Sequence, residues 1–224
     1  MRFGKKAAVG ISLLIMGLSI SGCAGDEEDE AGPFSATEVC DGVLSGGSAE
    51  AAVSLVGSNN FSGRGPGALD KVAKNLERSY GEPRGKYGAA YLCTLSSLDG
   101  PYNQIKVKFA TYPSGEADSD RWSERDHLYG IGERSFASSD GASLFFECVS
   151  HRVSGSDKDP LRVLGSMVYF KKPDTDSRDR RENNLTVLHA ASLAVAKKME
   201  CADDAGLPAK ADLRERKPST APAP

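Results

Sequence analysis

The residues of this chain with the most distinctive chemistry are its five cysteines, Cys23, Cys40, Cys93, Cys148 and Cys201. A thiol can carry a lipid, pair in a disulfide, bind a metal or act as a nucleophile, and its surroundings decide among these roles. Cys23 follows a basic start and an uncharged run over residues 7–22 that is rich in Ile, Leu and small residues. This layout is typical of an export signal, because the run is shorter than the ~20 residues that a transmembrane helix needs.

The residues just before Cys23, Ile20-Ser21-Gly22, together with Cys23 resemble the bacterial lipobox. The resemblance implies that a diacylglyceryl group is attached to Cys23 and that a signal peptidase cuts before it. Two acyl chains hold a protein stably in a bilayer, at ~0.8 kcal/mol per buried CH₂. The alternatives are an uncleaved anchor helix, or a signal cut elsewhere with Cys23 left free. We expect a chain anchored by lipid at the extracytoplasmic face of the cell membrane.

The other four cysteines form an even set in an exported chain, which indicates two disulfides with three available pairings. Cys40 is as far from Cys93 as Cys148 is from Cys201. Cys40 and Cys201 lie in helical patterns and Cys93 and Cys148 in strand patterns, so sequential pairing would fix each terminal helix to a sheet. A metal site is the rival, but there is no CxxC and histidine is scarce. We therefore expect the bridges Cys40–Cys93 and Cys148–Cys201.

Catalytic motifs are not found in the sequence. There is no GxSxG, no HExxH and no free cysteine once the disulfides form. The three histidines, His127, His151 and His189, are expected to be structural or solvated. A GxGxG stretch over residues 63–67 resembles part of a phosphate loop, but no strand precedes it and no Lys-Ser/Thr pair closes it. We expect no catalytic residue, no metal and no cofactor.

The longest stretch without a clear element runs from Ser114 to Ala142 and contains the only tryptophan. Loops of this length in compact domains are usually functional or disordered. Aromatic and arginine side chains are typical anchors of interfaces, so the residues expected to contact a partner are Arg121, Trp122, Arg125 and Tyr129. A partly ordered excursion with no special role, including a short helix over residues 118–130, is the alternative.

Periodicity predicts the elements that position these residues. A first helix is expected over residues 35–45 and a short second helix starts at a Ser48 cap and ends at Gly57. A central helix over residues 68–81 and a last helix capped by Asn183 or Asn184 carry apolar residues at helical spacing. Two antiparallel hairpins lie between them, over residues 87–113 and 143–172. The prediction is an α+β fold, with an antiparallel sheet of about four strands packed by the N-terminal, central and C-terminal helices.

Composition divides the chain into four parts. Residues 1–22 are the signal peptide, 23–33 an acidic tether, 34–205 a single extracytoplasmic domain and 206–224 a Pro-rich tail that is expected to be disordered. The formal net charge is -3. Without the cations of the leader and the acidic run of the tether, the domain is close to neutral. Together with export, this argues against nucleic-acid binding, which needs a clustered basic excess.

The order of lipobox, polar tether, first-helix Cys40, strand Cys93, strand Cys148 and final-helix Cys201 resembles the small secreted lipoproteins of actinobacteria. The resemblance implies an extracytoplasmic location and a disulfide-stabilised α+β form. We expect a binding module for a protein or cell-envelope partner, with a small-ligand-binding lipoprotein as the alternative and a cell-envelope hydrolase as a weaker one. A ligand binder should contain a deep apolar pocket with a few polar groups, and a partner binder an exposed aromatic and arginine patch.

Overall fold

The computed structural model describes residues 33–62, 67–83, 86–99, 104–117, 126–171, 173 and 175–216. The predicted signal peptide, the predicted lipidation site Cys23 and nearly all of the predicted acidic tether lie outside the described residues. The last part of the C-terminal tail, residues 217–224, lies outside them as well.

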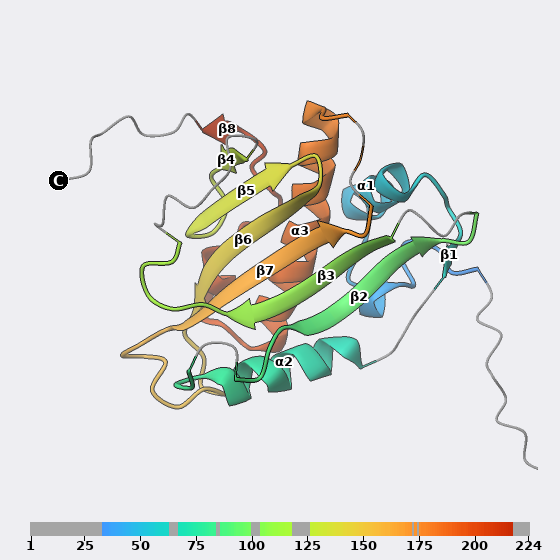
Figure 1. The fold of residues 1–224 in the computed structure, drawn as a ribbon. Coiled ribbons are helices and arrows are strands. Elements are labelled where there is room, and N and C mark those ends of the chain that lie inside the picture. The colour runs from blue at the N-terminus through green and yellow to red at the C-terminus, as the bar shows by residue number, and fades with distance from the viewer. Residues whose placement is uncertain are drawn as a thin grey trace, which may run out of the picture. The chain divides into compact units, whose positions relative to one another are not determined.

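The described residues form one antiparallel sheet of eight strands in the order β1-β2-β3-β7-β6-β5-β4-β8 (Figure 1). Its long central part consists of the two predicted hairpins, β2 with β3 and β6 with β7, which are joined where β3 pairs with β7. The strands are β1 (Phe61–Ser62), β2 (Ala90–Ser97), β3 (Gln104–Thr111), β4 (His127–Tyr129), β5 (Arg134–Ser138), β6 (Gly141–Cys148), β7 (Leu161–Tyr169) and β8 (Glu215–Arg216).

The expectation of about four strands understates this sheet. β4 and β5 come from the stretch 114–142, whose helical alternative is wrong where it is described, because His127–Tyr129 is a strand. Leu128 pairs with Phe136 across these two strands, and β5 in turn pairs with β6. Short strands of this kind are stabilised by backbone pairing with a neighbour, which a local sequence pattern does not reveal.

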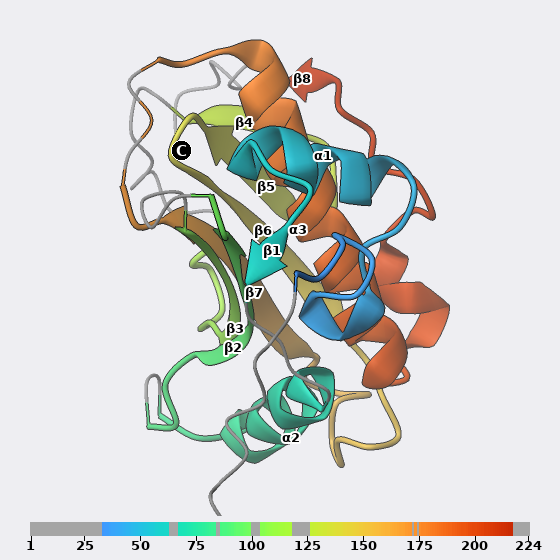
Figure 2. The same ribbon diagram turned by 90° about the vertical axis from the view of Figure 1, so that its right-hand side faces the viewer.

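The helices lie on one side of the sheet (Figure 2). They are α1 (Gly47–Val56), α2 (Ala68–Ser79) and α3 (Arg178–Lys198), with short 3₁₀ turns η1 (Cys40–Gly42) and η2 (Ala202–Gly206). α3 packs on β5, β6 and β7, α1 packs on α3, and α2 packs on β2. The predicted apolar face of α3 is confirmed: the core side chains Leu185, Leu188, Ser192, Val195 and Met199 are all fully buried.

A glycine in the middle of β7 lets α3 approach the sheet closely. A Cβ atom at Gly165 would lie 2.9 Å from Cε1 of Phe109, 3.0 Å from Oγ of Ser192 and 3.2 Å from Cδ1 of Leu188. These contacts come from a strand on one side and the helix on the other. Because protein interiors are close-packed, no side chain fits here without movement of its neighbours.

Three predicted helix starts differ from the structure. The first helix is only the 3₁₀ turn η1, because the backbone at Cys40 and Asp41 has positive φ. α1 starts after Gly46, and α3 starts at Arg178, where Ser177 Oγ accepts a hydrogen bond from the Arg180 amide at 3.2 Å. The cap is therefore Ser177, and neither asparagine caps the helix. The sequence pattern did not reveal this start because the first residues of the helix, RDRREN, are polar and show no apolar periodicity.

The disulfides pair as predicted. Cys40 is bonded to Cys93 and Cys148 to Cys201. The first bridge joins η1 to β2, and the second joins the end of β6 to Cys201, which lies three residues after the end of α3 and caps η2. Each bridge thus ties one end of the domain to the sheet.

The fold extends beyond the predicted domain end at residue 205. Leu207 is buried (4 % exposed) and β8 pairs with β4, so residues 206–216 belong to the domain. The prediction of a disordered tail from residue 206 is wrong for this segment. The mixture of charged, small and proline residues made it look unable to pack, but the burial of Leu207 and the pairing of β8 with β4 hold it in place. Among the described residues, no helix is both long and apolar enough to span a bilayer.

Candidate functional site

A groove of about 560 Å³ lies between α1, α3 and the C-terminal part of the described chain, and we call it the α1–α3 groove. Three parts of the chain form its walls: the segment that leads into α1, one face of α3, and the C-terminal segment, which we define as residues 207–213. The lining residues are Val43, Ser45, Gly47, Ser48, Thr186, His189, Ala190, Leu193, Ala194, Lys197, Ala209, Lys210, Ala211 and Leu213. Most of these side chains are small or apolar, so they leave an open, mainly apolar space between the three walls.

α3 supplies the central wall because it is apolar on two faces. Its first face packs on the sheet, and its second face contains Thr186, His189, Ala190, Leu193 and Lys197. These positions recur at the three- and four-residue spacing that brings side chains onto one side of a helix. A helix that is apolar on two sides needs a second covering layer. α1 and the C-terminal segment cover the second face of α3 only in part. The groove lies over the part of this face that they leave uncovered.

The wall at the start of α1 is held by reciprocal hydrogen bonds between two serines. The Ser45 amide donates to Ser48 Oγ, and the Ser48 hydroxyl donates to the Ser45 carbonyl, each at 2.9 Å. This arrangement satisfies polar groups at the helix start, as a cap does. The Ser48 hydroxyl is thereby used within the protein, and we expect it to shape the groove rather than bind a ligand.

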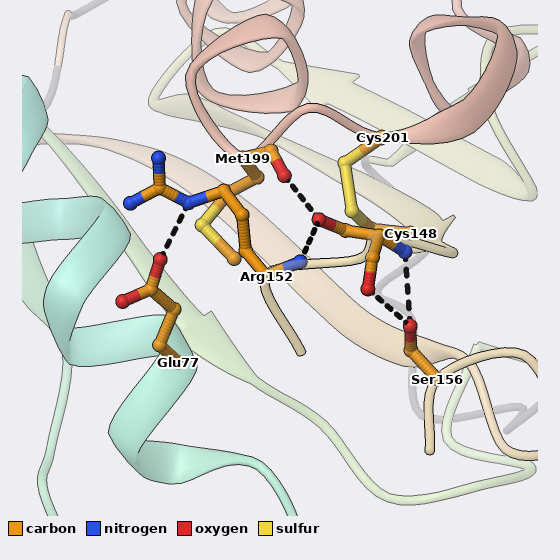
Figure 3. Close-up of a disulfide and its surroundings, with 7 residues drawn as sticks. Glu77, Cys148, Arg152, Ser156, Met199 and Cys201 are labelled. Carbon is orange, nitrogen blue, oxygen red and sulfur yellow. Dashed lines mark hydrogen bonds and ion pairs between the residues drawn. A yellow bond between two sulfur atoms is a disulfide. The ribbon is translucent and has the colours of Figure 1, made fainter. Parts of the chain in front are cut away.

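The second disulfide fixes where the third wall begins. Figure 3 shows Cys148 bonded to Cys201 beside the carbonyl of Met199, which accepts a hydrogen bond from the Ser150 hydroxyl. The Ala202 amide donates to the Val149 carbonyl at 2.8 Å, so the chain that leaves α3 is tied to the end of β6. From here the C-terminal segment runs back beside α3 toward β8 (Figure 2).

An ion pair between elements supports the same region. Arg152, which follows β6, contacts Glu77 of α2 at 2.7 Å (Figure 3) and Glu200 at 3.4 Å. Ser156 Oγ also donates to the Ser150 carbonyl at 2.8 Å and accepts from the Ser150 amide at 2.9 Å. The loop after β6, the end of α2 and the end of α3 are therefore held together around the disulfide.

His189 is the distinctive polar group of the groove. It is 4 % exposed, and its Nε2 atom has no hydrogen-bond partner. Burial lowers the pKa of His189, and the Pro208 carbonyl, which accepts a hydrogen bond from the ring, opposes this effect. Since Nε2 has no partner, we assign the bond with Pro208 to Nδ1. In the neutral ring Nε2 is then an acceptor, itself buried, that has no partner within the described residues.

The charges at the groove all have one sign. Among the described residues that line it, Lys197 and Lys210 are the charged ones, and none of these lining residues is an aspartate or glutamate. Both lysines are exposed and neither has a salt bridge within the described part of the chain. The nearest lysine in sequence, Lys198, is in contrast paired with Asp70 of α2. An apolar groove with two unpaired ammonium groups is suited to an amphipathic ligand of negative charge.

The residues predicted to contact a partner are not gathered into a described patch. Arg121, Trp122 and Arg125 lie outside the described residues. Tyr129 is in β4 and is 2 % exposed, so the expectation that it presents its ring to a partner is wrong. It packs in the main core with Ile131, because the strand turns its side chain toward the helices.

The sheet face turned away from the helices, which we call the open face, carries a second candidate surface. Three apolar side chains are exposed on it or at its margin: Tyr91 (55 %), Val168 (40 %) and Phe170 (70 %). The Lys106 ammonium lies 5.8 Å from the centre of the Tyr91 ring. A shallower hollow of about 370 Å³ adjoins this patch over β3, β7 and β6.

The other two histidines, His127 and His151, are each paired with a glutamate. His127 pairs with Glu215 of β8, and His151 pairs with Glu200 at 2.9 Å. Within the described ranges, no three His, Cys, Asp or Glu side chains are grouped as a metal site would require. The groove therefore offers binding groups, an apolar wall, one acceptor nitrogen and two cations.

Comparisons of this chain with protein-family models, with curated proteins and with solved structures found no match. The function must accordingly be inferred from the geometry of the chain itself. Sequence reasoning did not find the groove, although one signal was present: Ala190, Leu193 and Ala194 form a second apolar stripe on the last helix. His189 lies on that stripe.

Proposed function

We propose that this protein is a lipid-anchored, extracytoplasmic lipoprotein that binds a small ligand in the α1–α3 groove. The observation that carries the proposal is the buried His189, whose Nε2 lacks a partner in a groove whose other lining residues are mostly small or apolar. A buried polar atom without a hydrogen bond costs roughly 1–3 kcal/mol. A bound molecule that donates to Nε2 would remove this cost. Few polar groups in an apolar concavity are typical of ligand sites.

The anchor is the second part of the proposal and is supported by two features. The lipobox-like residues before Cys23 imply lipidation there, and the two disulfides favour an oxidising compartment outside the cytoplasm. Mass spectrometry of the mature protein should find a chain that begins at Cys23 and carries a diacylglyceryl group. A retained leader, or an unmodified Cys23, would contradict this part of the proposal.

Filling the groove tests ligand binding directly. Ala194→Phe adds a ring at the second face of α3, so it should abolish binding of the amphipathic dye 1-anilinonaphthalene-8-sulfonate, measured by fluorescence titration. Ser143→Phe adds a ring beside the hollow of the open face and is the matched control. It should leave dye binding unchanged. Equal binding by both variants, with unchanged circular dichroism, would show that the dye does not use the α1–α3 groove.

A protein or cell-envelope partner on the open face is the second candidate function. The specific observation is the exposure of Tyr91, Val168 and Phe170 beside Lys106 and Lys108. Exposed aromatic and apolar groups rimmed by charge are typical of interfaces. Crosslinking on intact cells, compared between the wild type and Phe170→Glu, tests this candidate. A crosslinked species that the substitution does not weaken would exclude this surface.

A further inference from the structure

This inference rests on the proposed ligand groove and concerns the class of molecule that it accepts. We infer that the α1–α3 groove selects an anionic amphiphile: an elongated apolar body with a negative group at one end and a hydrogen-bond donor along its length. Three observations carry the inference. They are the length of the groove along α3, the sign of its charges, and the unpartnered nitrogen of His189.

The groove is elongated because its central wall follows the helix axis. Its lining on α3 extends from Thr186 to Lys197. At a rise of 1.5 Å per residue, this is about 16 Å. The wall between these positions is made of Ala190, Leu193 and Ala194, which offer no polar group to a ligand. A narrow, extended apolar body fits this shape, and a compact polar molecule does not.

The charged end of the ligand is set by Lys197, and Lys210 adds a second positive charge to the groove. Lys197 lies at the C-terminal end of the α3 wall, and Lys210 comes from the C-terminal segment. The apolar wall binds the body of any amphiphile, so the charges at the groove decide the order of affinity among neutral, anionic and cationic ones. The two ammonium groups favour the anion and disfavour the cation, by an amount that salt reduces because both groups are exposed.

The hydrogen-bond donor is set by His189. This residue precedes Lys197 by eight positions on α3, so the two lie about 12 Å apart along the helix axis. With Nδ1 bonded to the Pro208 carbonyl, Nε2 accepts a hydrogen bond and cannot donate one while the ring is neutral. A hydroxyl or amide N–H remote from the anionic group satisfies it. A plain alkyl chain leaves it unpaired.

The test is a titration of the full chain carrying Cys23→Ala, so that no anchor lipid competes for the groove. The probes are dodecanoate, 12-hydroxydodecanoate, dodecanol and dodecyltrimethylammonium, each below its micelle concentration, with isothermal titration calorimetry as the readout. We expect the anions to bind more tightly than dodecanol, and the cation to bind most weakly. The hydroxylated anion should bind more tightly than dodecanoate. Equal affinity for dodecanoate and dodecanol would overturn the inference while leaving the proposed ligand groove intact.

Two sets of variants locate the effect. Lys197→Gln combined with Lys210→Gln should weaken dodecanoate binding about threefold to tenfold and leave dodecanol unchanged, as expected for two exposed ion pairs. The corresponding double substitution by arginine should keep the anion preference. His189→Leu should remove the advantage of 12-hydroxydodecanoate over dodecanoate. If the glutamine variant keeps the full anion preference, the lysines do not select the ligand.

The same chemistry is found in free acyl anions and in anionic membrane lipids, and a flotation arm separates them. Vesicles of phosphatidylglycerol and of phosphatidylcholine are mixed with the Cys23→Ala chain. Lysine-dependent binding to phosphatidylglycerol that dodecanoate displaces identifies a membrane lipid as the source. Binding of dodecanoate without vesicle binding identifies a free acyl anion. If none of the probes binds, both this inference and the proposed ligand function are wrong.

Discussion

Removing one disulfide at a time should destabilise the domain by nearly the same amount for each bridge. The perturbations are Cys40→Ala with Cys93→Ala, and Cys148→Ala with Cys201→Ala. Each bridge closes a loop with a sequence separation of 53 residues. In the chain-entropy description, a cross-link stabilises the fold because it restricts the unfolded chain, by an amount that depends on loop length. A loop of this size corresponds to about 4 kcal/mol at 25 °C.

The structure also indicates how far the two values can differ. Three of the four disulfide cysteines are buried. Since a Cys→Ala change removes a single sulfur atom, the cavities it leaves should contribute similarly to the two losses in stability. The second bridge has additional support, since the Ala202 amide and the Ser150 hydroxyl still tie the end of α3 to the end of β6. We therefore expect losses within about 1 kcal/mol of each other, given the scatter of measured disulfide effects.

The assay is guanidinium unfolding of the full chain without reductant, followed by far-ultraviolet circular dichroism. The slope of free energy against denaturant must be reported as well, because a cross-link makes the unfolded state more compact. Non-reducing peptide mapping of each variant verifies that the remaining bridge keeps its native pairing. A loss below about 1 kcal/mol for both variants, or losses that differ by more than about 2 kcal/mol, would refute the loop-length reasoning.

Three other measurements test the packing and the polar interior. Gly165→Ala should lower the free energy of unfolding by about 1–3 kcal/mol, because the new Cβ atom would crowd Phe109, Leu188 and Ser192. Gly47→Ala, at a helical position with no atom within 4 Å of the new Cβ, should lower it by nothing, and equal effects of the two variants would exclude crowding as the cause. Asn184→Leu should cost about 2 kcal/mol or more because it removes the hydrogen bonds at 2.8 Å to the Ser138 carbonyl and at 2.7 Å from the Tyr169 hydroxyl. Asn183→Leu, whose half-buried side chain donates to Ser54 Oγ at 3.2 Å, should stay within about 0.5 kcal/mol, and the reverse order would mean that the interior asparagine is misplaced. The lowered pKa of His189 means that the unfolded chain binds the proton more readily, so the stability that the neutral ring contributes is present above the ordinary pKa of 6.5 and is lost as the pH falls below it. Between pH 7.5 and 5 the melting temperature of His189→Leu should therefore fall less than that of the wild type, and equal falls would show that His189 is not the titrating group.

The parts of the fold that could be predicted are those where a local pattern and the tertiary environment agree. In β3, Ile105, Val107 and Phe109 alternate with Lys106 and Lys108, and the strand is buried on one face as this alternation requires. The apolar stripe of α2 is also buried as predicted, apart from Leu69, which is half-buried. Helix starts were less predictable, because a cap such as Ser177 is one short polar residue among many.

The parts that could not be predicted depend on contacts between distant residues. β5 has the sequence RSFAS, which shows no strong alternation, and it is a strand because it pairs with β6. The C-terminal segment has no period at all, and its place is set by the disulfide at Cys201 and by the burial of Leu207. One wall of the groove is formed by this C-terminal segment, so the groove could not be predicted. Its central residue, His189, gave no signal beyond its place on a second apolar stripe.

Both margins of the sheet end in strands of only two residues, β1 and β8. Next to β1, the long strand β2 has an irregular register between Tyr91 and Cys93, and Cys93 is bonded to η1. Sheets polymerise when a long, regular margin presents free amides and carbonyls to a second molecule. The protein should accordingly resist fibril formation and strand exchange even when it is highly concentrated, which favours its study by solution nuclear magnetic resonance.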